Sequence, residues 1–277
     1  MTSAAGNPSN LGTVTFFKDG TPLCSAVALT GNTATCSPSL AAGGPYSITA
    51  TYSGTTLAPG YSGSTSGPLA QTVNKATLTV TASSPTVTYG DPAPTITASY
   101  SGFKNGQDAT ALTTEPVCTT AYTTTSDATT TPSTNCSGGS ATNYTFSYVP
   151  GSVTVNTATL TVTASSPSVS YGDPVPTVTA GYSGFKNGQN ATALTTAPTC
   201  TTAYTTASAV ASSSATSCSG GVATNYSFSY VPGSVTVNTA TLTVTASSPS
   251  VAYGDPVPTI TPGYSGFKNS QDATALP

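Results

Sequence analysis

The sequence predicts an all-β protein built as an elongated tandem array of small modules. Residues 158–239 repeat residues 76–157 with 63 of 82 positions identical, and residues 240–277 begin a third copy. A repeat of this length indicates a modular array in which each unit is a small fold. Within each unit, short stretches alternate apolar and hydroxyl side chains between turns rich in Gly and Pro, which is typical of half-buried strands.

The repeat divides the chain into four expected parts. Residues 1–74 form a module of a different type, residues 75–157 and 158–239 form two complete repeats, and residues 240–277 form an incomplete third one. A unit of this size can bury a core of its own, with a thin margin of stability.

Successive modules are expected to meet directly. Val153 and Val155 occupy odd positions, whereas Ala158 and Leu160 occupy even ones, so the apolar face changes parity between them. Because side chains alternate between the two faces of a strand, this change predicts a boundary between two cores. No linker rich in Gly, Pro and Ser separates the modules, so we expect restricted freedom and a monomeric rod.

The first module is expected to contain a hairpin and further strands. The expected strands are Gly12–Phe17, Leu23–Leu29, Ala34–Leu40 and Tyr46–Tyr52. The second and third of them form the hairpin around Thr30-Gly31-Asn32, with Cys24 and Cys36 on its two arms.

Each repeat is expected to contain about six short strands. The clearest in the first copy are Thr77–Ala82, Thr95–Tyr100 and Asn143–Tyr148, each with apolar side chains on one face. Asp108 is expected to cap one short helical turn. Nine of the 19 substitutions between the complete copies fall between Thr125 and Asn135, which predicts a loop.

The first module resembles a known family. It carries Gly12-Thr-Val-Thr-Phe-Phe17, Leu40-Ala-Ala-Gly43, Ile48-Thr-Ala-Thr-Tyr-Ser-Gly54 and, near its end, Thr72-Val73. This pattern is similar to the bacterial Ig-like domain repeats of large surface proteins. The similarity covers the later strands of that family, so the resemblance implies a truncated Ig-like β-sandwich.

The repeats resemble a second family. The motifs that carry the resemblance are Tyr89-Gly90-Asp91-Pro92, Tyr100-Ser-Gly-Phe103, Asn105-Gly106, Ala141-Thr-Asn-Tyr144 and Tyr148-Val-Pro-Gly151. They are similar to MBG (Tyr-Asp-Gly type) modules of bacterial adhesins and secreted repeat proteins. The third copy carries the pattern only from Tyr253 to Asn269, and Ser270 replaces the expected Gly. The resemblance implies a β-rich, β-grasp-like unit without a known active site.

The six cysteines predict one disulfide in each of the first three modules. They form three close pairs, which are Cys24 with Cys36, Cys118 with Cys136, and Cys200 with Cys218. Buried free thiols are the alternative, and zinc is disfavoured because each module has two Cys and the chain has no His. Disulfides imply an oxidising compartment, so we expect an extracellular or cell-surface protein.

Composition disfavours several partners. Charged residues make up 5% of the chain and the net charge is −3, so nucleic acid is not an expected partner. No apolar run could span a membrane, and residues 1–8 lack the regions of a signal peptide. We therefore expect an exported protein whose export and anchoring signals lie outside this sequence.

Few residues could perform chemistry. The chain has no His, and the carboxylates of Asp108, Glu115 and Asp127 are lost in the second copy. Asp91 does recur, as Asp173 and Asp255, and it is expected to fix its own turn, with a calcium ligand as the alternative. The sequence thus predicts a non-enzyme without catalytic, cofactor-binding or metal-binding residues.

Three further residue sets have alternative interpretations. Lys104, Lys186 and Lys268 are expected to be solvated turn charges, with an isopeptide bond to Asn as the alternative. A tyrosine set is expected to pack in cores and at edges, with a sugar-stacking platform as the alternative; it comprises Tyr89, Tyr100, Tyr122, Tyr144 and Tyr148. Four glycosylation sequons are treated as chance, at Asn135, Asn143, Asn190 and Asn225.

These observations predict a non-catalytic stalk or spacer of an adhesin-like surface protein. One alternative is an array that binds carbohydrate or matrix proteins, in which repetition supplies avidity. It would show an exposed aromatic cluster repeated at an offset of 82 residues. Another is an accessory region of a large secreted hydrolase. The last alternative is that residues 240–277 complete the fold of a neighbouring subunit by strand addition.

Overall fold

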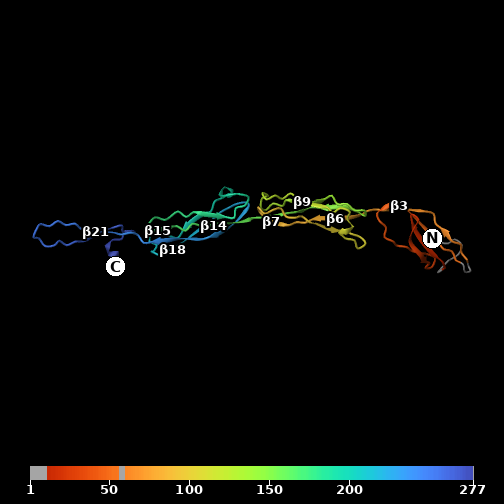
Figure 1. The fold of residues 1–277 in the computed structure, drawn as a ribbon, viewed down its shortest axis with the longest axis horizontal. Helices are drawn as coiled ribbons and strands as arrows, with labels where there is room; N and C mark the ends of the chain where they lie inside the picture. Colours follow the sequence, from red (N-terminus) through yellow and green to blue (C-terminus); the bar gives the residue numbers. More distant parts are fainter. Residues whose placement is uncertain (1–10, 56–59, 277) are drawn as a thin grey trace. The chain divides into compact units, whose positions relative to one another are not determined.

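The computed structural model describes residues 11–55 and 60–276, which divide into two compact units (Figure 1). Unit 1 contains residues 1–85, 95–121 and 133–153. Unit 2 contains residues 86–94, 122–132 and 154–277. The end of the first repeat therefore belongs with the second and third repeats. The expectation about a leader at residues 1–8 lies outside the described residues.

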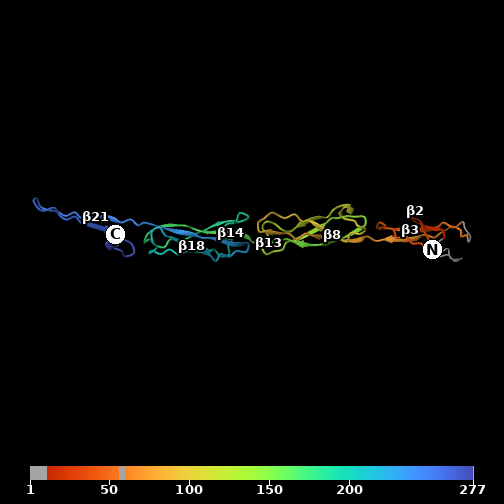
Figure 2. The same ribbon diagram turned by 90° about the horizontal axis from the view of Figure 1, so that it is seen from below.

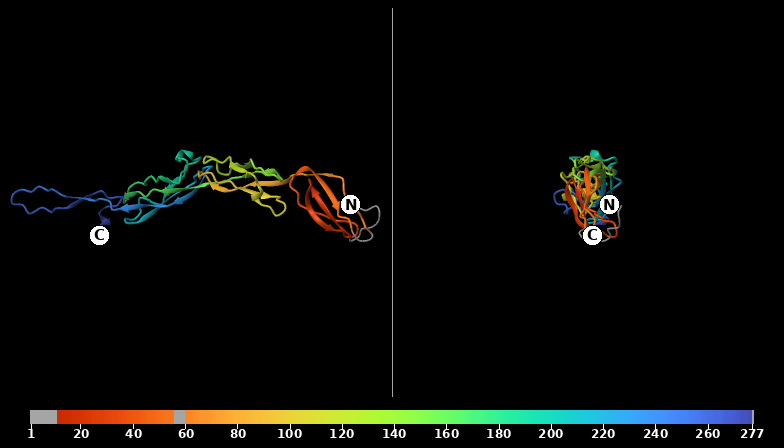
Figure 3. Two further views of the ribbon diagram at one scale, coloured as in Figure 1. Left: turned by 45° about the vertical axis from the view of Figure 1, so that its right-hand side comes forward. Right: turned by 90° about the vertical axis from the view of Figure 1, so that its right-hand side faces the viewer.

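Unit 1 begins with a five-stranded antiparallel sheet, drawn in red and orange in Figure 3. Its strands are β1 (Thr13–Lys18), β2 (Thr21–Ala28), β3 (Gly43–Tyr52), β4 (Ser64–Thr65) and β5 (Leu69–Val73). The order is β2-β1-β3-β4, and β5 also pairs with β3. Val14, Leu29 and Tyr52 form the buried core of this sheet.

The strand predicted at residues 34–40, the second arm of the hairpin in the first module, is wrong. Residues 34–40 form no strand, and only an isolated bridge joins Thr30 to Thr33. Pro38 lies in this segment and has no N–H to donate to a strand ladder. Cys36 nevertheless forms a disulfide with Cys24 of β2.

The body of the first repeat consists of two three-stranded sheets in unit 1. In one, β6 (Ala76–Ala82) lies between β11 (Tyr144–Val149), which is parallel to it, and antiparallel β8 (Ala98–Ser101). The other has the order β12-β10-β9 and contains β9 (Val117–Thr120), β10 (Ser133–Ser137) and β12 (Gly151–Ser152). Leu78 and Val80 of β6 are fully buried, because the period-two pattern directs them into the core.

Two local predictions in the first repeat have different outcomes. The strand expected from Thr95 begins instead at Ala98, and the N–H of Thr97 donates to the Ser83 hydroxyl rather than to a ladder carbonyl. The Asp108 cap is confirmed: its carboxylate accepts from the Thr110 N–H at 2.9 Å and opens the short 3-10 helix η1 (Ala109–Ala111).

Unit 2 contains the second repeat and the end of the first (Figure 2). From the first repeat it takes β7 (Thr86–Thr88) and β13 (Thr154–Asn156), which pair in parallel. In the second repeat, β14 (Ala158–Ala164) lies between parallel β19 (Tyr226–Val231) and antiparallel β16 (Ala180–Ser183). The remaining elements of this repeat are β15 (Ser168–Ser170), η2 (Ala191–Ala193), β17 (Thr199–Thr202), β18 (Ser213–Ser219) and β20 (Gly233–Asn238).

The second repeat has two separate clusters of buried side chains. Val162 and Ala164 of β14 pack with Cys218, while Val235 and Val237 of β20 pack with Tyr204. The four-stranded sheet β15-β20-β18-β17 carries the second cluster. Core packing is therefore present at both ends of the repeat.

The third repeat contributes one two-stranded arm, which Figure 1 shows in blue around β21. Its elements are β21 (Thr243–Ala246), β22 (Pro262–Ser265) and η3 (Ala273–Ala275). Val244 is 60% exposed, whereas Val162 at the corresponding position of the second repeat is fully buried. The difference arises because β21 lacks, among the described residues, the parallel neighbour that β14 has.

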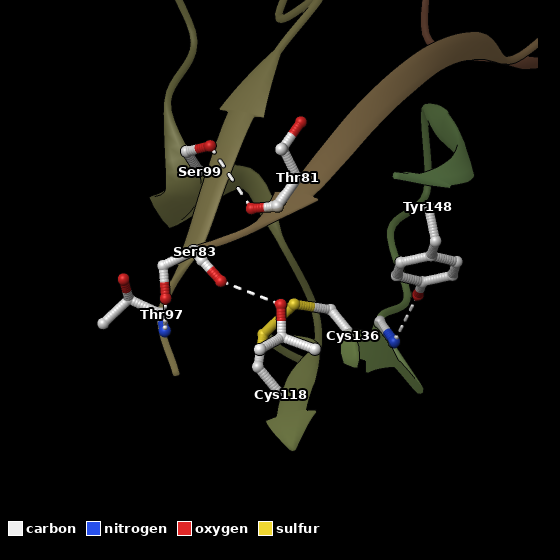
Figure 4. Close-up of a disulfide and its surroundings, with 9 residues drawn as sticks. Thr81, Ser83, Thr97, Ser99, Cys118, Cys136 and Tyr148 are labelled. Carbon is white, nitrogen blue, oxygen red and sulfur yellow. Dashed lines mark hydrogen bonds between the residues drawn. A yellow bond between two sulfur atoms is a disulfide. The ribbon is translucent and has the colours of Figure 1, made fainter. Parts of the chain in front are cut away.

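Three disulfides join the cysteines pairwise within modules. They are Cys24–Cys36, Cys118–Cys136 and Cys200–Cys218. In the repeats, the bonded cysteines lie directly opposite each other on antiparallel strands, β9 with β10 and β17 with β18. Figure 4 shows the Cys118–Cys136 bond close to Ser83. Each of these two bonds encloses the stretch in which the copies differ most.

Replacement of Cys200 and Cys218 by Ala should destabilise the second repeat. A disulfide that closes a loop of this length contributes about 3 kcal/mol to the free energy of unfolding in the chain-entropy model. We expect the calorimetric transition of this repeat to shift to lower temperature, while the first repeat, with its own disulfide, serves as the internal control. An unchanged transition would show that strand pairing alone determines the stability of the repeat.

Candidate functional site: the contact between successive repeats

The turn after β7 faces the second repeat inside unit 2. The Asp91 carboxylate accepts from the Thr88 N–H at 3.3 Å through Oδ2, which holds the turn as predicted. Its other oxygen, Oδ1, lies 3.4 Å from Nζ of Lys186 in the second repeat. One carboxylate therefore fixes its own turn and also binds the next repeat.

Gly90 makes room for the lysine that reaches this carboxylate. A Cβ at this position would lie 2.6 Å from Cβ of Lys186, closer than real side chains approach. Gly90 also has φ +83°, a conformation that L residues rarely adopt. In the Tyr-Gly-Asp order, the glycine has no side chain and therefore leaves room for the methylene groups of Lys186. The aspartate beside it provides a carboxylate for the lysine ammonium group.

Two asparagines of the second repeat bind the loop at residues 122–132. The Asn187 side-chain N–H donates to the Thr124 carbonyl at 2.8 Å. Asn225 accepts from the Ala128 N–H at 2.7 Å and donates to Asp127 at 2.9 Å. Most of these bonds use backbone atoms of the loop, so they do not depend on which side chains the loop carries.

Tyr226 belongs both to the core of the second repeat and to this contact. Its hydroxyl accepts from the Lys186 N–H at 2.9 Å and donates to the side-chain carbonyl of Gln189. Its ring packs edge-on against Tyr89 of the first repeat, with centroids 5.7 Å apart. Burial raises the pKa of the Tyr226 hydroxyl.

The contact recurs between the second and third repeats, also within unit 2. Lys268 Nζ lies 3.0 Å from Asp173, and the Asn269 side chain donates to the Thr206 carbonyl at 2.7 Å. Gly172 faces the stem of Lys268, as Gly90 faces Lys186. The hydrogen bond from Lys268 and a second one from the Ser170 N–H lower the pKa of Asp173.

A related contact joins the first repeat to the Ig-like sheet inside unit 1. Asn143, the counterpart of Asn225, accepts from the Ala42 N–H at 2.8 Å. Within the first repeat, next to this contact, Lys75 Nζ donates to the Ala141 carbonyl at 3.0 Å. In the described residues Lys104 forms no ion pair of the kind that Lys186 makes. The asparagine contact is therefore shared, and the lysine–aspartate pair belongs to contacts between repeats.

Several predicted residue roles change in the structure. Lys186 and Lys268 are not solvated turn charges, as was expected, because an aspartate of the preceding repeat pairs with each of them. The side chains of Asn143 and Asn225, which lie in sequons treated as chance, each accept from a backbone N–H across a boundary. Of the tyrosines expected in cores and at edges, Tyr89, Tyr122 and Tyr144 are buried and Tyr100 is partly buried against the core. Tyr148 is 37% exposed and stacks on Phe146.

The sequence contained a signal for these contacts. The lysine and the aspartate each recur at the same offset of 82 residues, while Asp108, Glu115 and Asp127 do not. Opposite charges that recur together at a fixed spacing indicate a pair. Without a fold, however, nothing shows that Lys186 lies beside Asp91 rather than beside its neighbours in sequence.

The part of the chain that the structure describes has no group of three or more His, Cys, Asp or Glu side chains able to hold a metal ion. Within residues 11–55 and 60–276, no helix is both long enough and apolar enough to cross a membrane.

The fold and the recurring contact define an all-β tandem-repeat protein. The chain belongs to the MBG family: the MBG domain (YGX type) matches residues 78–154 and 160–236. The YGX type fits the Tyr89-Gly90 order better than the Tyr-Asp-Gly type named from the resemblance. The bacterial Ig-like domain (group 3) matches residues 1–74. No curated protein matches the chain.

Replacement of Gly90 by Ala should open the contact between the first and second repeats. The added methyl group would overlap the Lys186 stem, and the left-handed backbone costs about 1–2 kcal/mol for an L residue. We expect faster amide exchange at residues 122–130 and around Lys186. Gly254→Ala is the matched control, since Gly254 has φ +95° with nothing within 4 Å. Equal exchange at the contact in both variants would contradict the role of Gly90.

The ion pair between Asp173 and Lys268 should weaken in acid. Because the folded pKa of Asp173 is lowered, the pair contributes fully above the unfolded pKa of about 3.9 and is lost as pH falls through the folded pKa. Lys268→Met should raise the Asp173 pKa toward its ordinary value in a carboxyl NMR titration. Asp108, whose pKa is lowered by Thr110, is the control and should not change. An unchanged Asp173 pKa would show that the pair does not form in solution.

Proposed function

We propose that this chain is a non-catalytic stalk or spacer of a secreted or cell-surface bacterial protein of the adhesin type. The observation that carries the proposal is the recurrence of one contact between successive repeats. Asp91 with Lys186 and Asp173 with Lys268 occupy identical positions of their repeats. Asn187 and Asn269 likewise bind carbonyls at equivalent loop positions. A chain whose successive repeats are joined by the same contacts is suited to hold another part of the protein at a fixed distance.

The surroundings of these contacts support a spacing role over a catalytic one. The charged side chains of the ion pair at each contact are partnered within the chain, and so are the Tyr226 hydroxyl and the Asp127 carboxylate at the first contact. Bacterial Ig-like and MBG domains are typically non-catalytic. These domains, together with three disulfides, are consistent with an extracellular protein.

Direct binding of carbohydrate is the second candidate function, and one repeated observation favours it. Tyr148 is 37% exposed and stacks on Phe146 with centroids 6.0 Å apart, and Tyr230 is 36% exposed and stacks on Phe228 at 6.0 Å. Each tyrosine hydroxyl accepts from a glycine N–H, Gly139 or Gly221, which fixes the ring. Figure 4 shows how Tyr148 projects beside the disulfide. A fixed aromatic face could stack on a sugar ring.

The two functions predict different results on an array of glycans and matrix proteins. A spacer should give no selective binding of the oxidised chain, because its contacts are satisfied internally. Selective binding that disappears in Tyr148→Ala/Tyr230→Ala would favour the carbohydrate-binding function and contradict the spacer. Tyr253→Ser is the control, because Tyr253 is fully exposed but has no stacking partner in the described chain. Binding that also disappears in this control would not be specific to the stacked pairs.

A further inference from the structure

The dipeptide Asn-Gly occurs twice in the chain, at equivalent positions of the first two repeats. The two sites are Asn105-Gly106 and Asn187-Gly188. The asparagine and the glycine have φ of 56° and 70° in the first repeat, and of 52° and 68° in the second. Positive φ at both central residues is typical of a type I′ turn. In the first repeat, the Gln107 N–H closes this turn on the Lys104 carbonyl at 3.0 Å, and the second repeat has the same bond.

An asparagine that precedes a glycine can react with the backbone. The glycine nitrogen attacks Cγ of the asparagine side chain and loses its proton, and the side-chain nitrogen leaves as ammonia. The product is a five-membered succinimide ring, which water opens at either carbonyl to give aspartate or isoaspartate. Glycine favours the reaction because it has no side chain to shield its nitrogen and because its backbone rotates freely.

The two Asn-Gly sites have the same local surroundings in sequence and in backbone geometry. Residues 100–107 and 182–189 are identical. A Cβ added at Gly106 or at Gly188 would have nothing within 4 Å, so both glycines border open space. The turn must unwind at either site before the ring forms, and this requirement is common to both. A difference in reactivity between the sites therefore depends on what each asparagine side chain contacts.

The contacts of the two asparagine side chains differ. The Asn187 side-chain N–H donates to the Thr124 carbonyl at 2.8 Å, as part of the contact between the first and second repeats. Among the described residues, the Asn105 side chain has no hydrogen-bond partner. It borders a hollow of about 160 Å³ that Ala42 and Asn143 also line. Asn105 therefore has room to rotate its amide, whereas Asn187 is held.

We propose that Asn105 and Asn187 are sites of deamidation, and that the contact between the first two repeats protects Asn187. Asn105 reacts in the folded chain. Asn187 reacts only after its bond to Thr124 opens, because Cγ must turn away from that carbonyl to meet the Gly188 nitrogen. A reaction that requires a local opening is slowed by the fraction of time that the contact stays closed.

Deamidation of Asn187 would prevent the contact from closing again in the same form. A carboxylate has no N–H to donate to the Thr124 carbonyl, and its oxygens would repel the carbonyl oxygen. Isoaspartate also adds a methylene group to the backbone of the turn. The reaction therefore makes a temporary opening of the contact permanent. At Asn105 the same reaction removes no hydrogen bond among the described residues.

The test incubates the whole oxidised chain in neutral buffer and follows both sites by peptide mapping and mass spectrometry. Asn187 should react at least about tenfold more slowly than Asn105, the ratio that an opening free energy of about 1.4 kcal/mol sets. In the reduced chain unfolded in urea, the two sites should react at equal rates, because their local sequences are identical. Asn269 is the slow reference, since Ser270 follows it and its side chain also binds a loop carbonyl.

Gly90→Ala separates the role of the contact from that of the turn. This variant opens the contact at a distance from Asn187 in sequence, so the Asn187 rate should rise toward the Asn105 rate while the Asn105 rate stays unchanged. Gly254→Ala is the matched control and should change neither rate, because an added Cβ at Gly254 meets nothing within 4 Å.

Two substitutions imitate the direct product of the reaction. Asn187→Asp should speed amide exchange at residues 122–130 several-fold, because the donor to the Thr124 carbonyl is lost. Asn105→Asp is the matched control in the identical turn of the first repeat, and it should leave the exchange of residues 122–130 unchanged. Both asparagines are exposed, so both variants should keep their fold.

Three results would overturn the proposal. One is equal reaction at Asn105 and Asn187 in the folded oxidised chain, which would mean that the contact gives no protection. Another is an unreactive Asn105 in the folded chain over the time in which the unfolded chain reacts, which would mean that the turn alone protects both sites. The third is unchanged exchange at residues 122–130 in Asn187→Asp, which would show that the contact tolerates the product.

Discussion

The parallel pairing of the first strand of a repeat with its tyrosine-bearing strand is the constraint on which the rest of the fold depends. In the second repeat, Ala158 lies opposite Tyr226, so residues far apart in sequence must meet before the unit closes. The pairing buries Leu160 and Val162 completely. It also places Tyr226 at the end of the repeat that faces the first repeat, where its ring packs against Tyr89. Its hydroxyl accepts from the Lys186 N–H and so holds the turn that carries this lysine.

The contact between repeats is made of several modest interactions rather than one strong bond. The Asp91–Lys186 pair is about two-fifths exposed on each side, and such pairs contribute about 0.2–1 kcal/mol. The hydrogen bonds of Asn187 and Asn225 act at the same surface, and Gly90 permits the close approach. Together these groups hold the turn and the loop of the first repeat against the second repeat within unit 2.

Local sequence patterns were enough to predict the elements whose pattern lies within a few consecutive residues. The alternation of Thr with Leu78, Val80 and Ala82 predicted a strand with one apolar face, and Asp108 predicted a cap, because both patterns are visible within a few residues. The hairpin arm at residues 34–40 also alternates apolar and hydroxyl residues, yet it forms no strand. Pro38 has no N–H to donate to a ladder, and Cys36 is held by a disulfide without strand pairing.

The candidate site was less predictable, because its partners are distant in sequence. Asp91 and Lys186 are 95 residues apart, and only the fold shows that an aspartate of one repeat meets a lysine of the next. The Asp91 turn was predicted correctly because Thr88 is close in sequence. The same carboxylate therefore combines a local role that sequence patterns reveal with a distant role that they do not.

The loop that receives the next repeat offers mainly its backbone, and this has a consequence for how such a chain can change. Asn187 and Asn269 each bind a carbonyl oxygen, of Thr124 and Thr206, although the loop residues that follow differ between the copies. Asn225 likewise binds the N–H of Ala128. Any copy can therefore follow any other without new complementary side chains. Duplication or deletion of whole 82-residue segments would change the length of the array in steps and leave every joint intact.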